Sequence, residues 1–158
     1  MRLLVLDLDG TLWDHGDASR LVPPYEFHGD YLSDAYGEEL HLFPGVREFL
    51  EWVSWRFLLT IASWNVEEKV RPILEGFGLW DYFLFPKIEG HPNKADMIRR
   101  SLEELASMGY TIEEVIYVDD RDIHIEDVKT TAPSIQFIHM WRDAKSFEEL
   151  RKLLGRMG

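Results

Sequence analysis

The hydrophobic residues along the chain alternate between short unbroken runs and longer stretches with helical spacing. Unbroken apolar runs are typical of strands that are buried on both faces of a sheet. In the stretches between them, apolar residues recur at i, i+3, i+4 and i+7, which indicates helices. This alternation predicts an α/β fold with a mostly parallel sheet covered by helices on both faces. The expected strands are 3–6, 57–62, 82–85, 115–118 and 135–139, and the expected helical stretches are 46–53, 66–77, 98–105 and 147–154.

The second helical stretch carries its own start and stop signals. Asn65 precedes it, and asparagine is a favoured N-cap, so we expect Asn65 to cap this helix. Gly78 ends the apolar stripe. Pro72 lies inside the stripe, and because proline lacks an N–H we expect a kink or an early break there.

Residues 14–43 interrupt the alternation of strands and helices. They contain Pro23-Pro24, scattered glycines and two short alternating pieces, YEF and ELHLF. A small β-hairpin flap beside the first strand and a long surface loop are equally compatible with this pattern. Thirty-odd residues are too few for a separate folded unit, so we expect residues 1–158 to form a single domain.

The composition is that of a globular chain with a strong excess of acid. The 158 residues include 29 acidic and 17 basic side chains, which gives a formal net charge of −12. A chain this acidic lacks the excess of basic side chains that would neutralise nucleic-acid phosphates, so we expect no nucleic-acid partner. No apolar run approaches the ~18 residues of a membrane span, and we expect no membrane partner. The absence of cysteine excludes thiolate catalysis, and Met1 leads directly into the first strand, so we expect a cytoplasmic protein without a signal peptide.

Two aspartates follow the first strand, at the edge where open α/β sheets bind ligands. Asp7 and Asp9 are one residue apart and run into Gly10 and Thr11. An ionised Asp7 is suited to attack phosphorus, and Asp9 to protonate a leaving oxygen and then activate water. Thr11 adds a hydroxyl, and Gly10 allows a close approach of the backbone.

Other polar residues follow later strands of the predicted sheet. Asp119 and Asp120 end the run VIYV, where a parallel sheet brings them beside Asp7. Such a carboxylate cluster suits a hard divalent cation, and we expect Mg²⁺. Ser63 follows the run FLLTIA and precedes a helix, a position where phosphate groups bind. Lys94 is the expected cation of the site, and Lys87 is the competing candidate.

These four motifs, in this order, resemble those of the haloacid dehalogenase superfamily. DLDGT at 7–11 resembles its first motif, Ser63 its second, Lys94 its third and Asp119-Asp120 its fourth. Within the superfamily the chain looks similar to the magnesium-dependent phosphatase family, which lacks a large cap domain. The stretches that carry this second resemblance are DLDGTLW, PPY, LFPGVREFL and VDDRDIHIEDV.

The resemblance implies a Rossmann-like sheet without a large cap and a two-step hydrolysis of phosphate monoesters. Asp7 would become a phosphoaspartate, and Asp9 would act first as acid and then as base. Mg²⁺ would be held by Asp7, the backbone carbonyl of Asp9 and Asp120, with Asp119 bound directly or through water. The residues implied to hold the phosphoryl group are Thr11, Ser63, Trp64, Asn65 and Lys94.

The chain departs from the family pattern at two positions. The SWN segment at 63–65 replaces the more familiar Ser-Arg or Ser-Lys, and His124 stands where Asn is common. Both departures bear on substrate identity rather than on reaction class. The implied substrates are phosphorylated protein side chains, such as phosphotyrosine, or small sugar phosphates, acted on by a monomer or a homodimer.

Three other functions remain compatible with the acidic site. A phosphotransferase would use the same chemistry, although most need a cap to exclude water. A phosphoacceptor signalling domain also has an acidic pocket on a parallel sheet, but it needs a phosphoaspartate that Asp9 would hydrolyse. A catalytically silent binding module is disfavoured by the presence of Asp7, Asp9 and Lys94.

Overall fold

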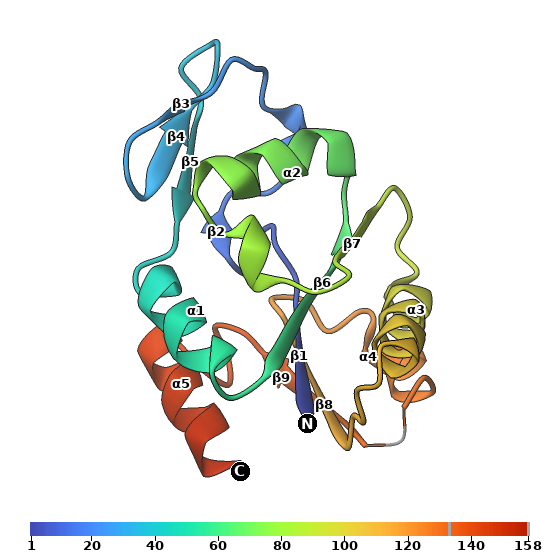
Figure 1. Ribbon diagram of the computed structural model, residues 1–158. Helices are drawn as coiled ribbons and strands as arrows, with labels where there is room; N and C mark the ends of the chain where they lie inside the picture. Colours follow the sequence, from blue (N-terminus) through green and yellow to red (C-terminus); the bar gives the residue numbers. More distant parts are fainter. Residues whose placement is uncertain (133, 158) are drawn as a thin grey trace.

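The computed structural model describes residues 1–132 and 134–157 and contains a five-stranded, all-parallel central sheet. The strand order is β7-β6-β1-β8-β9, so the first strand of the chain lies in the middle of the sheet (Figure 1). The predicted α/β architecture is therefore confirmed. The strands are β1 (Arg2–Leu6), β6 (Leu58–Trp64), β7 (Lys87–Glu89), β8 (Glu114–Asp119) and β9 (Ile135–His139).

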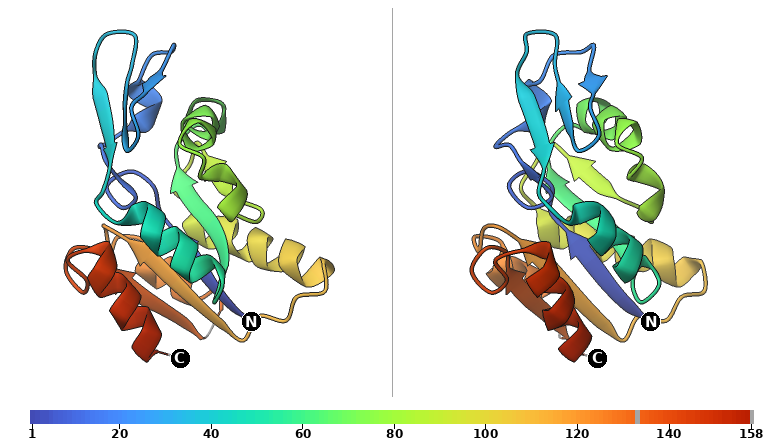
Figure 2. Two further views of the ribbon diagram at one scale, coloured as in Figure 1. Left: turned by 60° about the vertical axis from the view of Figure 1, so that its left-hand side comes forward. Right: turned by 90° about the vertical axis from the view of Figure 1, so that its left-hand side faces the viewer.

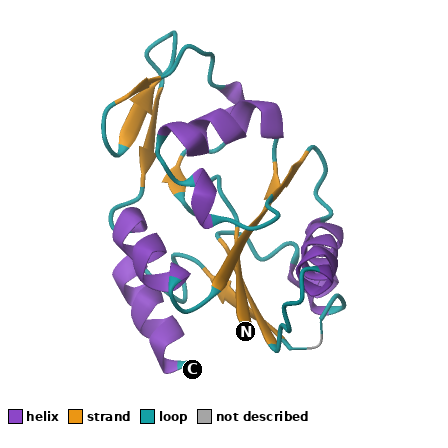
Figure 3. Cartoon of the chain, viewed as in Figure 1, coloured by secondary structure: helices purple, strands orange, loops and turns teal. Residues whose placement is uncertain are grey.

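Helices cover both faces of this sheet (Figure 3). Leu4 and Leu6 of β1 belong to a buried cluster shared with the first and last helices. Leu3 and Val5 point to the opposite face and pack with the third helix. This alternation along one strand explains why β1 reads as an unbroken apolar run. The helices are α1 (Val46–Ser54), α2 (Glu67–Gly76), α3 (Lys94–Ser107), α4 (Ile125–Lys129) and α5 (Phe147–Arg156).

The insertion after β1 folds into a small antiparallel sheet, here called the flap sheet. Its strands are β2 (Trp13–Asp14), β3 (Glu26–Phe27), β4 (Tyr31–Ser33) and β5 (Glu39–Leu42), in the order β2-β5-β4-β3. A short 3₁₀ helix, η1 (Ala18–Arg20), connects β2 to β3. The expected hairpin is present as part of these four strands, and the interpretation as a long surface loop was wrong.

The flap sheet packs against α2, as both views of Figure 2 show. The ring of Phe27 lies so close to Gly76 that a Cβ atom there would approach the ring to 2.0 Å. Phe27 also meets Phe77 edge to face, with ring centroids 5.1 Å apart. Arg47 of α1 donates hydrogen bonds to Asp30 Oδ1 (2.7 Å) and to the Phe77 carbonyl (2.8 Å). These contacts fix the flap sheet to α1 and α2.

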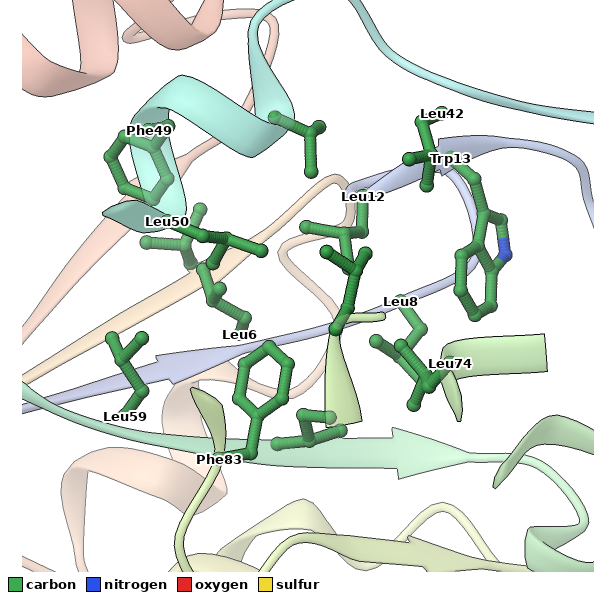
Figure 4. Close-up of a cluster of buried hydrophobic side chains, with 14 of the residues drawn as sticks. Leu6, Leu8, Leu12, Trp13, Leu42, Phe49, Leu50, Leu59, Leu74 and Phe83 are labelled. Carbon is green, nitrogen blue, oxygen red and sulfur yellow. The ribbon is translucent and has the colours of Figure 1, made fainter. Parts of the chain in front are cut away.

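The main hydrophobic cluster joins the central sheet to the flap sheet. Figure 4 shows Leu6 of β1 beside Leu50 of α1, and Trp13 of β2 beside Leu74 of α2. All four side chains are completely buried. Because one core serves both sheets, the loop between β1 and β2, which carries Asp7 and Asp9, is held from both sides.

One predicted strand was wrong. The stretch 82–85 does not form a strand, because 3₁₀ helix η2 (Trp80–Tyr82) precedes it and Phe85 adopts a left-handed conformation (φ 48°). The strand at this edge of the sheet is instead β7, which pairs with residues 62–64 of β6. The apolar character of the stretch reflects burial of Phe83 in the main cluster.

The predicted N-cap of α2 was also wrong. The helix begins at Glu67 with Val66 as its N-cap, and the Asn65 side chain instead accepts a hydrogen bond from Val66 N (2.7 Å). The alternative of an early break at Pro72 was wrong as well, because α2 continues through Pro72 to Gly76, and the kink stays a prediction. In the described part of the chain, no helix is long and apolar enough to cross a membrane.

Candidate active site

The carboxyl ends of β1, β6 and β8 open onto a cavity of about 680 Å³. The cavity lies at the edge of the sheet where the candidate residues were expected from the sequence. Asp9, Ser63 and Lys94 reach it from three different segments. The sequence-predicted residues that line the cavity are Asp7, Asp9, Ser63, Trp64, Asn65, Lys94 and Asp120.

Lys94 is the cation at the centre of the site. Its Nζ lies 2.7 Å from Asp7 Oδ1 and 2.8 Å from Asp119 Oδ2, and its side chain is 1% exposed. Burial alone would lower the pKa of Lys94, but the two carboxylates outweigh burial and raise it, so the ammonium stays charged. Lys87, the competing candidate, pairs with Glu104 instead (2.6 Å).

Asp119 is held from three sides below the cavity. Besides Lys94, the Tyr117 hydroxyl donates to Asp119 Oδ2 and the Arg121 N–H donates to Oδ1 (3.0 Å). Burial opposes ionisation, but Lys94 and these donors lower the pKa of Asp119 below its ordinary value. Asp119 is therefore an ionised carboxylate whose oxygens already have protein partners.

Three carboxylates lie close enough to share one cation. Oxygens of Asp7, Asp119 and Asp120 all lie within 4.8 Å of one another. Thr11 Oγ1 joins two of them, lying 3.1 Å from Asp7 Oδ2 and 3.2 Å from Asp120 Oδ1, and it accepts a hydrogen bond from Asp120 N (3.0 Å). Burial, reinforced by the neighbouring carboxylates, raises the pKa of Asp7. An all-oxygen donor set of this kind suits Mg²⁺.

The backbone at Gly10 allows this close approach. Gly10 has φ +76°, and a Cβ atom there would lie 2.4 Å from Asp120 Oδ2. Trp141 Nε1 donates to the Gly10 carbonyl (2.7 Å), and His139 Nε2 lies 2.9 Å from the Asp120 carbonyl. Any side chain at position 10 would be strained and would displace Asp120.

Asp9 faces the cavity from the other side and is surrounded by donors. Its carboxylate accepts from Trp13 Nε1 (2.8 Å), Ala18 N (3.1 Å) and Asn65 Nδ2 (2.6 Å). Burial nevertheless raises the pKa of Asp9, although these hydrogen bonds oppose the effect. A raised pKa favours a carboxylic acid that donates a proton and then accepts one.

Several residues have different surroundings from those that the sequence indicated. Thr11 is completely buried behind Asp7 and Asp120 and does not line the cavity. The Asn65 amide contacts Asp9. His124 is also buried, and within the described residues its Nε2 has no hydrogen-bond partner.

Sequence reasoning missed four residues that surround the site. Arg121 lines the cavity, and its position directly after Asp120 was a usable signal. Tyr117 was read only as part of an apolar strand, although its hydroxyl binds Asp119. Asp17 and Ser19 reach the cavity from the segment after β2. Their position depends on how the flap sheet folds, so no local pattern marked them.

Comparisons with known proteins agree with this geometry. The model of the NLI interacting factor-like phosphatase family matches residues 2–157. A search of curated proteins found no significant match. A putative phosphatase from Clostridium difficile is similar in structure, with TM-score 0.62 and 19% identity over 95% of this chain and 89% of that one.

Two further structures show the same fold. A haloacid dehalogenase superfamily hydrolase from Geobacter sulfurreducens has TM-score 0.66 and 16% identity over 97% of this chain and 99% of that one. The N-terminal part of a Bacteroides fragilis protein, containing a phosphatase domain complexed with Mg, has TM-score 0.61 and 22% identity. That match covers 96% of this chain but only 39% of the Bacteroides chain.

Proposed function

The chain belongs to the NLI interacting factor-like phosphatases, within the haloacid dehalogenase superfamily, and from this premise we propose that it hydrolyses phosphate monoesters through an aspartyl phosphate on Asp7. The observation that carries the proposal is that two neighbouring aspartates have different surroundings. Asp7 contacts Lys94 and belongs to the carboxylate cluster, whereas Asp9 lies outside that cluster and accepts hydrogen bonds from three neutral donors. One is suited to attack, the other to transfer protons.

The first step transfers the phosphoryl group to the enzyme. An Asp7 oxygen attacks phosphorus, the bond from phosphorus to the leaving oxygen breaks, and Asp9 gives that oxygen its proton. In the second step Asp9, now a carboxylate, takes a proton from water. The resulting hydroxide attacks phosphorus, releases inorganic phosphate and regenerates the Asp7 carboxylate. Asp9 is thereby returned to its protonated state.

The carboxylate cluster supports a Mg²⁺ requirement. We assign Asp7, Asp120 and the backbone carbonyl of Asp9 as the groups that would hold the ion. Asp119 already binds Lys94, Tyr117 and a backbone N–H, which supports contact through water rather than directly. Bound Mg²⁺ would neutralise the phosphoryl oxygens and make phosphorus easier to attack.

The contacts refine the roles of the other predicted residues. Ser63 and Lys94 line the cavity and are assigned to phosphoryl oxygens. Asn65 is assigned to holding Asp9, because its amide donates to that carboxylate at 2.6 Å. Thr11 is assigned to holding Asp7 beside the metal site, since its hydroxyl is buried behind the cavity.

The mouth of the cavity supports a leaving group with a flat or apolar face. Trp64 and Val66 both line the cavity and remain 49% and 42% exposed. An exposed apolar pair beside a polar site is typical of a ligand-binding surface. We therefore place phosphorylated side chains such as phosphotyrosine first among the substrates, and sugar phosphates second. Replacing Trp64 with Ala should raise KM for an aryl phosphate, whereas Trp55→Ala, which removes an exposed indole at the C-cap of α1, should not.

The remaining features of the proposal follow from the same observations. We propose a single domain over residues 1–158 that acts in the cytoplasm as a monomer or homodimer, without nucleic-acid or membrane partners. The acidic surface and the absence of cysteine support this setting. A phosphotransferase or a phosphoacceptor is disfavoured, because the cavity is open to water and Asp9 lies beside the nucleophile.

Phosphate release from an aryl phosphate tests the proposal. The native protein should turn over with Mg²⁺ and not with EDTA, and Asp7→Asn should abolish turnover. Asp127→Asn, which removes an exposed carboxylate on α4, is the matched control and should retain it. Turnover that persists in Asp7→Asn would contradict the assigned nucleophile. A long-lived phosphoenzyme without phosphate release would favour the phosphoacceptor function.

A further inference from the structure

An anionic substrate meets an unfavourable charge in this cavity. The chain has a formal net charge of −12, and Asp7, Asp9, Asp17 and Asp120 all line the cavity. A phosphate monoester is a dianion near neutral pH. The field of the whole protein repels it, so its binding depends on positive charge placed at the site: the Mg²⁺ proposed for the carboxylate cluster and basic side chains.

Lys94 by itself does not meet this requirement. Its Nζ lies 2.7 Å from Asp7 and 2.8 Å from Asp119, so its charge is shared between two carboxylates. The position after Ser63 carries no cation either, because Trp64 occupies it. Among the described residues that line the cavity, the one other basic side chain is Arg121.

Arg121 is placed by the backbone and free at its charged end. Its N–H donates to Asp119 Oδ1 at 3.0 Å, which ties this turn to the ionised carboxylate below the cavity. Within the described residues no carboxylate lies within 4.0 Å of its guanidinium, although four aspartates line the same cavity as this exposed side chain. An unpaired guanidinium at the mouth of an acidic cavity is available to an incoming anion.

We propose that Arg121 binds anionic oxygens of the substrate at the mouth of the cavity and sets part of the substrate affinity. The inference rests on the proposed function, because it places a phosphate monoester there. The planar fork of arginine matches phosphate and carboxylate oxygens equally well. The oxygens belong either to the phosphoryl group itself or to a second acid on the leaving group, and the experiment below separates these sources.

The experiment compares Arg121→Gln and Arg121→Lys with Arg156→Gln. Arg156 is exposed in the last turn of α5, far along the chain from the site, and its replacement removes the same charge. Each variant is assayed with phenyl phosphate and with 4-carboxyphenyl phosphate in Mg²⁺. Binding of inorganic phosphate is measured by calorimetry. Circular dichroism checks that all variants are folded.

We expect Arg121→Gln to raise KM about tenfold with little change in kcat, the size expected for one charge-assisted contact at an exposed site. Arg121→Lys should recover part of the loss, and Arg156→Gln should match the native protein. If Arg121 contacts the phosphoryl group, both substrates and inorganic phosphate bind more weakly. If it contacts a second acid, only the carboxylated substrate is affected.

Equal KM values for Arg121→Gln and Arg156→Gln with both substrates, together with equal phosphate affinity, would overturn the inference. The proposed function would still stand if the native protein turned over. If the native protein shows no Mg²⁺-dependent turnover, the proposed function fails, and calorimetry with inorganic phosphate and with unhydrolysed 4-carboxyphenyl phosphate decides about Arg121 separately. Weaker binding of either ligand by Arg121→Gln than by Arg156→Gln would then support the contact, and equal binding of both would refute it.

Discussion

Replacing Lys94 with Met tests the electrostatic centre of the site. The methionine chain retains most of the buried volume, so the main effect is the loss of one charge that contacts Asp7 at 2.7 Å and Asp119 at 2.8 Å. Removing one partner of a buried ion pair costs about 3–5 kcal/mol, because the remaining charge is left uncompensated. Here two carboxylates remain, so we expect a loss within that range at pH 7 in EDTA.

The loss should depend on pH with a defined sign. In the native protein Lys94 holds the pKa of Asp119 below its ordinary value, so this carboxylate stabilises the fold at neutral pH and less so in acid. Without Lys94, burial raises the pKa of Asp119 above its unfolded value and raises the pKa of Asp7, already high in the native protein, further. The folded variant then binds more protons than the unfolded chain, and its stability falls as pH rises. The difference between variant and native protein should therefore shrink from pH 7 toward pH 4.

Urea unfolding of both proteins at several pH values measures this difference. Lys87→Met is the matched control, because Lys87 is also buried but pairs with a single carboxylate, Glu104, that is 40% exposed. It should cost clearly less than Lys94→Met. A loss below about 1 kcal/mol for Lys94→Met, or a difference that does not change with pH, would refute the reasoning.

Three further predictions follow from particular contacts. Asn65→Leu removes a donor that lowers the pKa of Asp9, so the basic limb of the kcat/KM profile should move to higher pH; an unchanged limb would contradict Asp9 as the acid. Gly76→Ala should destabilise the fold by about 1–3 kcal/mol in urea unfolding, because its Cβ would collide with Phe27. Gly155→Ala, with nothing within 4 Å, should instead stabilise the protein by up to ~1 kcal/mol. Mg²⁺ should bind more weakly as pH falls, because burial raises the pKa of Asp7 in the carboxylate cluster. Calorimetry of Mg²⁺ binding in two buffers should detect the protons that binding releases.

The sequence predicted the part of the site that depends on strand ends. Asp7 and Asp119 follow apolar runs, and parallel strands bring their carboxyl ends to one edge of the sheet. The proximity of the two aspartates could therefore be predicted without knowing the loop conformations. Lys94 was separable from Lys87 only in the structure. Both lysines are buried, and the difference lies in which carboxylate each one reaches.

The wrong predictions concern side chains whose surroundings depend on tertiary contacts. Phe83 belongs to an apolar stretch that resembles a strand, but it fills the core while Phe85 turns out of the extended conformation. Asn65 looked like a helix cap, yet its amide holds Asp9, which lies 56 residues earlier. Neither partner is visible in a local pattern, because each contact joins segments that are distant in sequence and meet only in the tertiary structure.

Trapping the phosphoenzyme tests the central claim most directly. The Asp9→Asn variant, which lacks the base for the second step, is mixed with an aryl phosphate and Mg²⁺, quenched in acid and mapped by mass spectrometry. We predict a hydroxylamine-sensitive phosphoryl group on Asp7 that is absent from the Asp7→Asn variant. Phosphate release without any phosphoryl group on Asp7, or a phosphoryl group on another residue, would contradict the account.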